Sequence, residues 1–70
     1  MEKSLLDLLT KEKELLMNVM FCRKTINSIK LGKLPESALE DYKLRLKTVE
    51  TDLLNCRKEI AEYFQYISSI

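Results

Sequence analysis

The side chains that could support chemistry are few in this chain of 70 residues. It contains no histidine, the commonest acid–base group and metal ligand of proteins. Its single glycine cannot form the glycine-rich loop that holds a phosphate. Cys22 and Cys56 each lack a second cysteine at the CxxC spacing of redox and metal sites. These gaps predict a protein that is not an enzyme and that uses no metal or cofactor.

Glu12 is the one carboxylate inside the apolar repeat that organises the chain. A carboxylate buried without a partner has a raised pKa and is suited to proton transfer. In the fold that the repeat predicts, however, Arg57 and Lys58 lie next to the residue that faces Glu12. We therefore expect Glu12 to reach toward a cation and to have no catalytic role.

Apolar residues recur at alternating spacings of three and four on both sides of a turn at residues 31–36. The two series mirror each other about position 34, so that facing residues have numbers that sum to 68, as Val19 and Val49 do. This spacing is typical of helices that pack along a heptad seam, and reversal at a turn makes them antiparallel. The seam consists of Met1, Leu5, Leu8, Leu15, Val19, Cys22, Ile26 and Ile29 before the turn and Leu39, Tyr42, Leu46, Val49, Leu53, Cys56, Ile60, Tyr63 and Ile67 after it.

Residues that start and stop helices place the boundaries. Ser4, with Asp7 three residues later, can cap the first helix, and Gly32 is suited to the left-handed conformation that ends it. Pro35 suits the first turn of the second helix, which we expect to start at 35 or 36. The sequence thus predicts an all-α fold: a two-helix antiparallel coiled-coil hairpin forming a single domain over residues 1–70. Its helices cover about 4–31 and 35–67, and the turn covers 32–34.

Charged residues flanking the seam agree with this register. When Leu5 and Leu39 are each placed at heptad position a, Lys11 and Glu59 both fall at g. Arg23 and Glu50 both fall at e. Positions of the same letter lie on one side of an antiparallel pair. We therefore expect opposite charges to meet across the seam at both places.

The two cysteines fall in different layers of the hairpin, about 15 Å apart along its axis. This separation is too large for a disulfide. We expect Cys22 and Cys56 to be small core residues.

Composition argues against several classes of partner. Twelve basic and eleven acidic residues leave a net charge of +1, which gives no attraction to nucleic acid or anionic membranes. No apolar run approaches the roughly 18 residues that span a bilayer, and the start of the chain lacks the features of a signal peptide. We expect a cytoplasmic protein with no nucleic acid, membrane or small-molecule substrate. Heptad spacing favours packing over base stacking for its aromatic residues Tyr42, Tyr63, Phe64 and Tyr66.

A second series of apolar residues lies outside the seam, at heptad positions b and e. Because the e edges of an antiparallel pair lie on one side, these residues share one face of the hairpin. Contiguous apolar patches on a surface mark interaction sites, although such residues can also merely broaden the core. We predict that this face binds another protein chain. The face, called the stripe below, consists of Leu6, Leu9, Leu16, Met20, Leu54, Ala61 and Phe64.

The turn Gly32-Lys33-Leu34-Pro35-Glu36, followed by Tyr42, a ladder of Leu and Val and basic residues, resembles the small E-type co-chaperones of type III secretion needle subunits. The resemblance covers most of the chain in architecture. It implies a bacterial cytoplasmic protein that pairs with a larger chaperone built of helical repeats. Together the two would hold the needle subunit unpolymerised.

Two functions remain open at this level. The first is the co-chaperone. The second is a self-associating hairpin, a four-helix bundle formed by two copies, that acts as a small adaptor for RNA or a transcription protein. Neither the partner nor the stoichiometry can be read from the sequence, nor whether Phe21 and Tyr66 form a second contact site.

Overall fold

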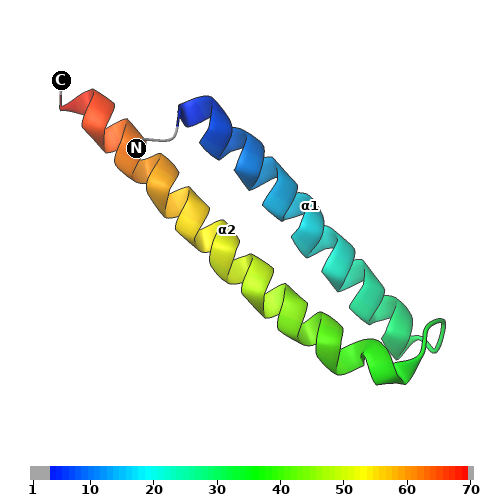
Figure 1. Cartoon of the computed structure of the whole chain (residues 1–70). Helices are drawn as coiled ribbons and strands as arrows, with labels where there is room; N and C mark the ends of the chain where they lie inside the picture. The colour runs from blue at the N-terminus through cyan, green and yellow to red at the C-terminus, as the bar shows by residue number, and fades with distance from the viewer. Residues whose placement is uncertain (1–3, 70) are drawn as a thin grey trace.

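The computed structural model describes residues 4–69 as two long helices side by side, α1 (Leu5–Lys30) and α2 (Leu39–Ser68). The short 3-10 helix η1 (Glu36–Ala38) precedes α2. The helices run in opposite directions, and the described chain begins and ends at the same end of the hairpin (Figure 1). The molecule measures 54 × 18 × 15 Å. The predicted all-α hairpin is confirmed.

Local hydrogen bonds explain where α1 starts and stops. The Asp7 N–H donates to Ser4 Oγ at 3.1 Å, which satisfies one of the unpaired donors of the first turn. At the other end, Gly32 N–H donates to the Ile29 carbonyl and Lys33 N–H to the Ser28 carbonyl. These two bonds form a Schellman motif, which requires a left-handed residue. Gly32 supplies it with a φ of 78°.

The second helix begins later than the sequence indicated. Pro35 has a φ of −59° but a ψ of 131°, so the chain is still extended at the position expected to start the helix. One 3-10 turn follows, closed by a bond of 3.2 Å from Ala38 N–H to the Pro35 carbonyl. The α-helix starts only at Leu39. Proline fixes φ and leaves ψ free, so it permits a helix at this point without imposing one.

The core is the single seam between the two helices. Leu8, Leu15, Val19, Leu53 and Cys56 form its centre, and Leu46, Val49 and Ile60 pack against them. Every predicted seam residue within 4–69 is buried or half-buried except Ile67, which is exposed. The predicted partner of Ile67 is Met1, which lies outside the described residues.

Within residues 4–69, two ion pairs cross the seam and support the predicted register. Arg23 Nη2 lies 2.8 Å from Glu50 Oε2, as expected from their shared e position. Arg57 Nε lies 3.0 Å from Glu12 Oε2, one residue from the predicted partner Cys56. The Lys11–Glu59 contact stays a prediction.

Candidate protein-binding face

The seam holds the residues that sequence analysis considered for chemistry. Both cysteines are free and buried, and Cys56 Sγ donates a hydrogen bond of 3.3 Å to the Leu8 carbonyl. A buried thiol in an apolar layer packs as a small hydrophobic group. Within residues 4–69, no group of three or more Cys, Asp or Glu side chains is placed to hold a metal ion.

Glu12 reaches a cation, as the sequence indicated. Its side chain keeps 26% of its surface exposed, and its carboxylate accepts a hydrogen bond from Arg57 Nε. The alternative of a buried carboxylate without a partner is wrong. The pair lets a charged residue occupy a seam position, because the carboxylate turns out of the apolar layer toward the guanidinium and water.

All seven stripe residues lie on the surface. The three at e positions, next to the seam, are the better covered: Leu16 is 36% exposed, Leu9 42% and Phe64 51%. The outer b positions are more open: Met20 is 68% exposed, Leu54 70% and Leu6 73%, and Ala61 is also exposed. The e residues thus form the inner edge of the face, and the b residues form its outer edge.

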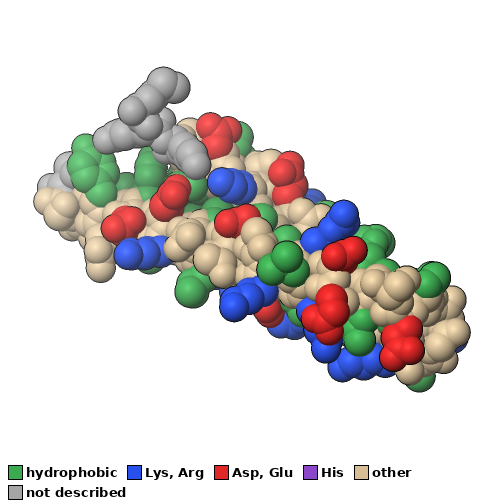
Figure 2. Space-filling model, turned by 60° about the horizontal axis from the view of Figure 1, so that its bottom comes forward, with side chains coloured by type: hydrophobic (Ala, Val, Ile, Leu, Met, Phe, Trp, Pro, Cys, Tyr) green, Lys and Arg blue, Asp and Glu red, His purple; other side chains and the backbone are tan. Residues whose placement is uncertain are grey.

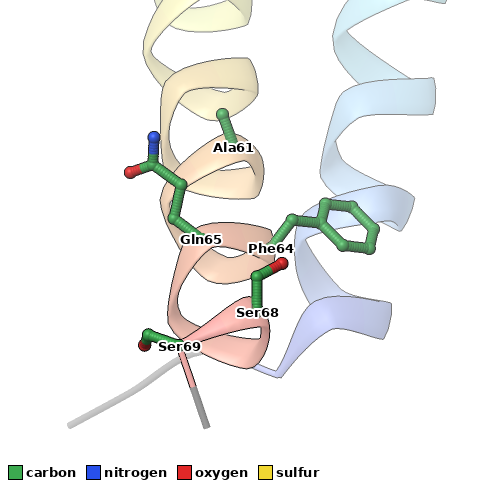
Figure 3. Close-up of a pocket in the computed structure, with 5 residues that line it drawn as sticks. All are labelled: Ala61, Phe64, Gln65, Ser68 and Ser69. Atoms are coloured by element: carbon green, nitrogen blue, oxygen red, sulfur yellow. The ribbon is translucent and has the colours of Figure 1, made fainter.

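Phe64 extends from α2 in the direction of α1, whereas Gln65 points away from it (Figure 3). Phe64 and Ala61 line an open hollow of about 540 Å³ near the end of α2, together with Gln65, Ser68 and Ser69. Large apolar side chains beside a hollow are typical of anchor residues in interfaces. Phe64 is the largest side chain of the stripe.

The stripe is not continuous along the hairpin. The ion pair Glu12–Arg57 and the ion pair Arg23–Glu50 lie on the same side of the seam, because Arg57, Arg23 and Glu50 are all e residues. The Glu12–Arg57 pair separates the part of the stripe near the chain ends from the part that contains Leu16. The Arg23–Glu50 pair lies where the stripe ends on the side of the turn. On the face drawn in Figure 2, hydrophobic side chains lie scattered between acidic and basic ones. A partner that covers the stripe must therefore accommodate charges as well as apolar side chains.

The opposite face carries a cluster that sequence analysis did not assign. The Phe21 and Tyr42 rings have centroids 6.3 Å apart at an angle of 60°, and the Arg45 guanidinium lies 5.2 Å from the Tyr42 ring centre. Tyr42 belongs to the seam, but its ring extends to the side of the hairpin where Phe21 and Arg45 lie. This direction depends on the Tyr42 rotamer, which heptad spacing does not specify. A groove of about 450 Å³ lies here, lined by Asn18, Phe21, Cys22, Leu44, Arg45, Thr48 and Val49. Tyr66 is exposed on the same face.

The chain matches no family model, no curated protein and no solved structure. Within the described residues, neither helix is apolar over a sufficient length to cross a membrane.

Proposed function

We propose that this hairpin is a non-enzymatic protein-binding module whose stripe docks on another chain. Its most specific form is the bacterial cytoplasmic co-chaperone that the turn motif resembles. In that role it pairs with a larger helical-repeat chaperone and helps to hold a type III secretion needle subunit unpolymerised.

The observation that carries the proposal is the amount of surface left open. The hairpin exposes 5788 Å², roughly 1,250 Å² more than the approximately 4,500 Å² of a compact monomer of 8.2 kDa. One partner contributes about 800 Å² to a typical stable protein interface. The excess is therefore large enough for a complete interface.

The thin core supports the same conclusion. Two helices have only one seam, and among residues 4–69 no side chain is completely enclosed. Many large hydrophobic side chains remain exposed, those of Leu6, Met20 and Leu54 by about 70%. Covering apolar surface stabilises a complex by about 25 cal/mol per Å². A partner on the stripe therefore supplies the layer that the hairpin lacks.

The test compares one substitution in the stripe with one on the opposite face. Leu16→Glu places a charge at the least exposed stripe position. We expect the free energy of binding to the partner to weaken by a few kcal/mol, because apolar contact is lost and a charge is buried. Asn18→Glu introduces the same side chain on the other side of the seam and should bind nearly normally. The partner is first isolated by affinity purification of the tagged chain from its host and identified by mass spectrometry. Binding of the purified partner is then measured by calorimetry.

Circular dichroism of both variants shows whether the hairpin stays folded. Equal affinity of Leu16→Glu and Asn18→Glu would contradict the assignment of the stripe. A cross-linking footprint centred on Lys11, Asn18 and Asp52 would also contradict it.

A further inference from the structure

Charged residues are sorted between the two faces of the hairpin. Among residues 4–69, the face at heptad positions e and b, which carries the stripe, has six basic and three acidic residues, a net charge of +3. Glu12 is counted here with its partner Arg57. The basic residues are Lys13, Arg23, Lys30, Lys43, Lys47 and Arg57, and the acidic ones are Glu12, Glu40 and Glu50.

The face at positions g and c has the opposite character. It carries two basic and six acidic residues, a net charge of −4. The basic residues are Lys11 and Arg45, and the acidic ones are Asp7, Glu14, Asp41, Asp52, Glu59 and Glu62. The whole chain is nearly neutral at +1, so its composition alone hides this separation.

The positive charge of the stripe face is concentrated toward the turn. The apolar residues of the stripe end at Met20 on α1 and at Leu54 on α2, and basic side chains continue the face from there to the turn. Arg23 and Lys43 are paired with Glu50 and Glu40 at 2.8 and 3.8 Å, and all four side chains are well exposed. Lys30 and Lys47 are exposed and have no acidic partner among residues 4–69. We call Arg23, Lys30, Lys43 and Lys47 the basic segment.

We propose that the stripe face binds a different protein, whose surface has an apolar strip that continues into an acidic patch opposite the basic segment. This inference rests on the proposed function and specifies the chemistry of its partner. The argument is charge complementarity: an interface pairs opposite potentials, and like charges brought together exclude a wrong partner.

A second copy of the hairpin does not provide that complement. A closed two-fold dimer places the same patch of both subunits in contact. If the two hairpins run in parallel, the basic segments meet each other. If they run in opposite directions, each basic segment meets the half of the stripe that contains Glu12, Lys13 and Arg57, which has a net charge of +1 among residues 4–69. Charge therefore opposes the four-helix bundle formed through this face and favours a partner of another sequence.

The test reverses charge in the basic segment and leaves the stripe intact. In the double variant Lys43→Glu with Lys47→Glu, two exposed cations become anions. Its matched control is Lys24→Glu with Lys58→Glu, which makes the same change in net charge at exposed f positions away from the seam. The probe is the purified partner identified for the proposed function, and its affinity is measured at 50 and 500 mM NaCl.

We expect the Lys43/Lys47 variant to bind at least about tenfold more weakly at 50 mM NaCl, mainly through slower association. We expect the difference from the parent chain to shrink at 500 mM, because the Debye length falls well below 10 Å. The Lys24/Lys58 control should stay within about threefold of the parent chain. Circular dichroism should be unchanged in both variants, since all four positions are exposed.

The possible failures are distinguishable. If Leu16→Glu abolishes binding but the Lys43/Lys47 variant binds like its control, the acidic partner is wrong and the proposed function stands. If sedimentation shows a dimer that strengthens with salt and is lost in Leu16→Glu, the occupant is a second copy and this inference is overturned. Binding to phosphatidylserine vesicles that the Lys43/Lys47 change abolishes would assign the segment to a lipid surface and also overturn it. A monomer that captures no protein would overturn the proposed function as well.

Discussion

At the scale of single residues, the Glu12–Arg57 pair is an ion pair at the edge of the seam. Its two side chains are 26% and 51% exposed, so water screens their attraction. The geometry is nevertheless favourable, because Arg57 Nε donates a hydrogen bond to Glu12 Oε2 at a distance of 3.0 Å. The pair thus limits the cost of a carboxylate in the seam and adds little net stability.

A double-mutant cycle of Glu12→Ala and Arg57→Ala measures this contribution. We expect a coupling energy of about 0.5–1 kcal/mol in the free energy of unfolding at low salt, falling as salt is added. Urea unfolding followed by circular dichroism gives the four values. The control cycle is Glu40→Ala with Lys43→Ala, whose 3.8 Å pair is more exposed and should give less coupling. A stronger coupling in the control cycle would contradict the assignment.

At the scale of the helices, the seam carries most of the packing, so its centre is the most sensitive position. Leu53 is 7% exposed within the core cluster. Leu53→Asp buries an unpaired charge there, and we expect a loss of several kcal/mol of unfolding free energy. Asn55→Asp makes the same acidic side chain two residues away at an exposed position and should change stability by less than about 0.5 kcal/mol. The two variants are compared by thermal and urea unfolding, and similar midpoints would rule out the seam as described.

The heptad spacing of apolar residues was sufficient to predict the two helices and their antiparallel arrangement. Only one way of pairing two such helices in a hairpin buries both series of apolar residues. The roles of Gly32 and Ser4 could also be predicted from the sequence. Gly32 supplies the left-handed conformation that ends α1, and Ser4 supplies the side-chain acceptor that caps its first turn. The start of the second helix was not readable, because Pro35 leaves ψ undetermined. The contact between Phe21 and Tyr42 depends on rotamers, about which spacing gives no information.

For the molecule as a whole, the sequence indicated which apolar residues lie outside the seam and so are not required to hold the two helices together. All seven stripe residues are on the surface, with Leu9, Leu16 and Phe64 nearest the seam. Heptad spacing identifies the apolar residues of the stripe and shows that Lys13 interrupts them, but it does not show how the other charges are distributed around them. Placed on the folded hairpin, the same charges lie within the stripe face and extend it toward the turn. Whether a partner uses the face is a property of two chains, and one sequence contains half of that information.

The position of the chain ends has a mechanical consequence. The described chain begins and ends at the same end of a molecule 54 Å long, and the turn lies at the other end (Figure 1). A force that separates the two ends acts on the terminal layer of the seam first. It then opens one layer after another toward Gly32. A force between the turn and one end loads many layers at once and meets greater resistance.

The hairpin should therefore unzip under tension at low force even when it resists heat and urea. An optical-tweezers measurement with handles at both chain ends should give gradual extension at lower force than one with handles at Lys33 and the C-terminal end. Equal rupture forces in the two geometries would contradict this. Because the stripe contains residues of both helices, separation of the chain ends would also take the stripe apart, one layer after another.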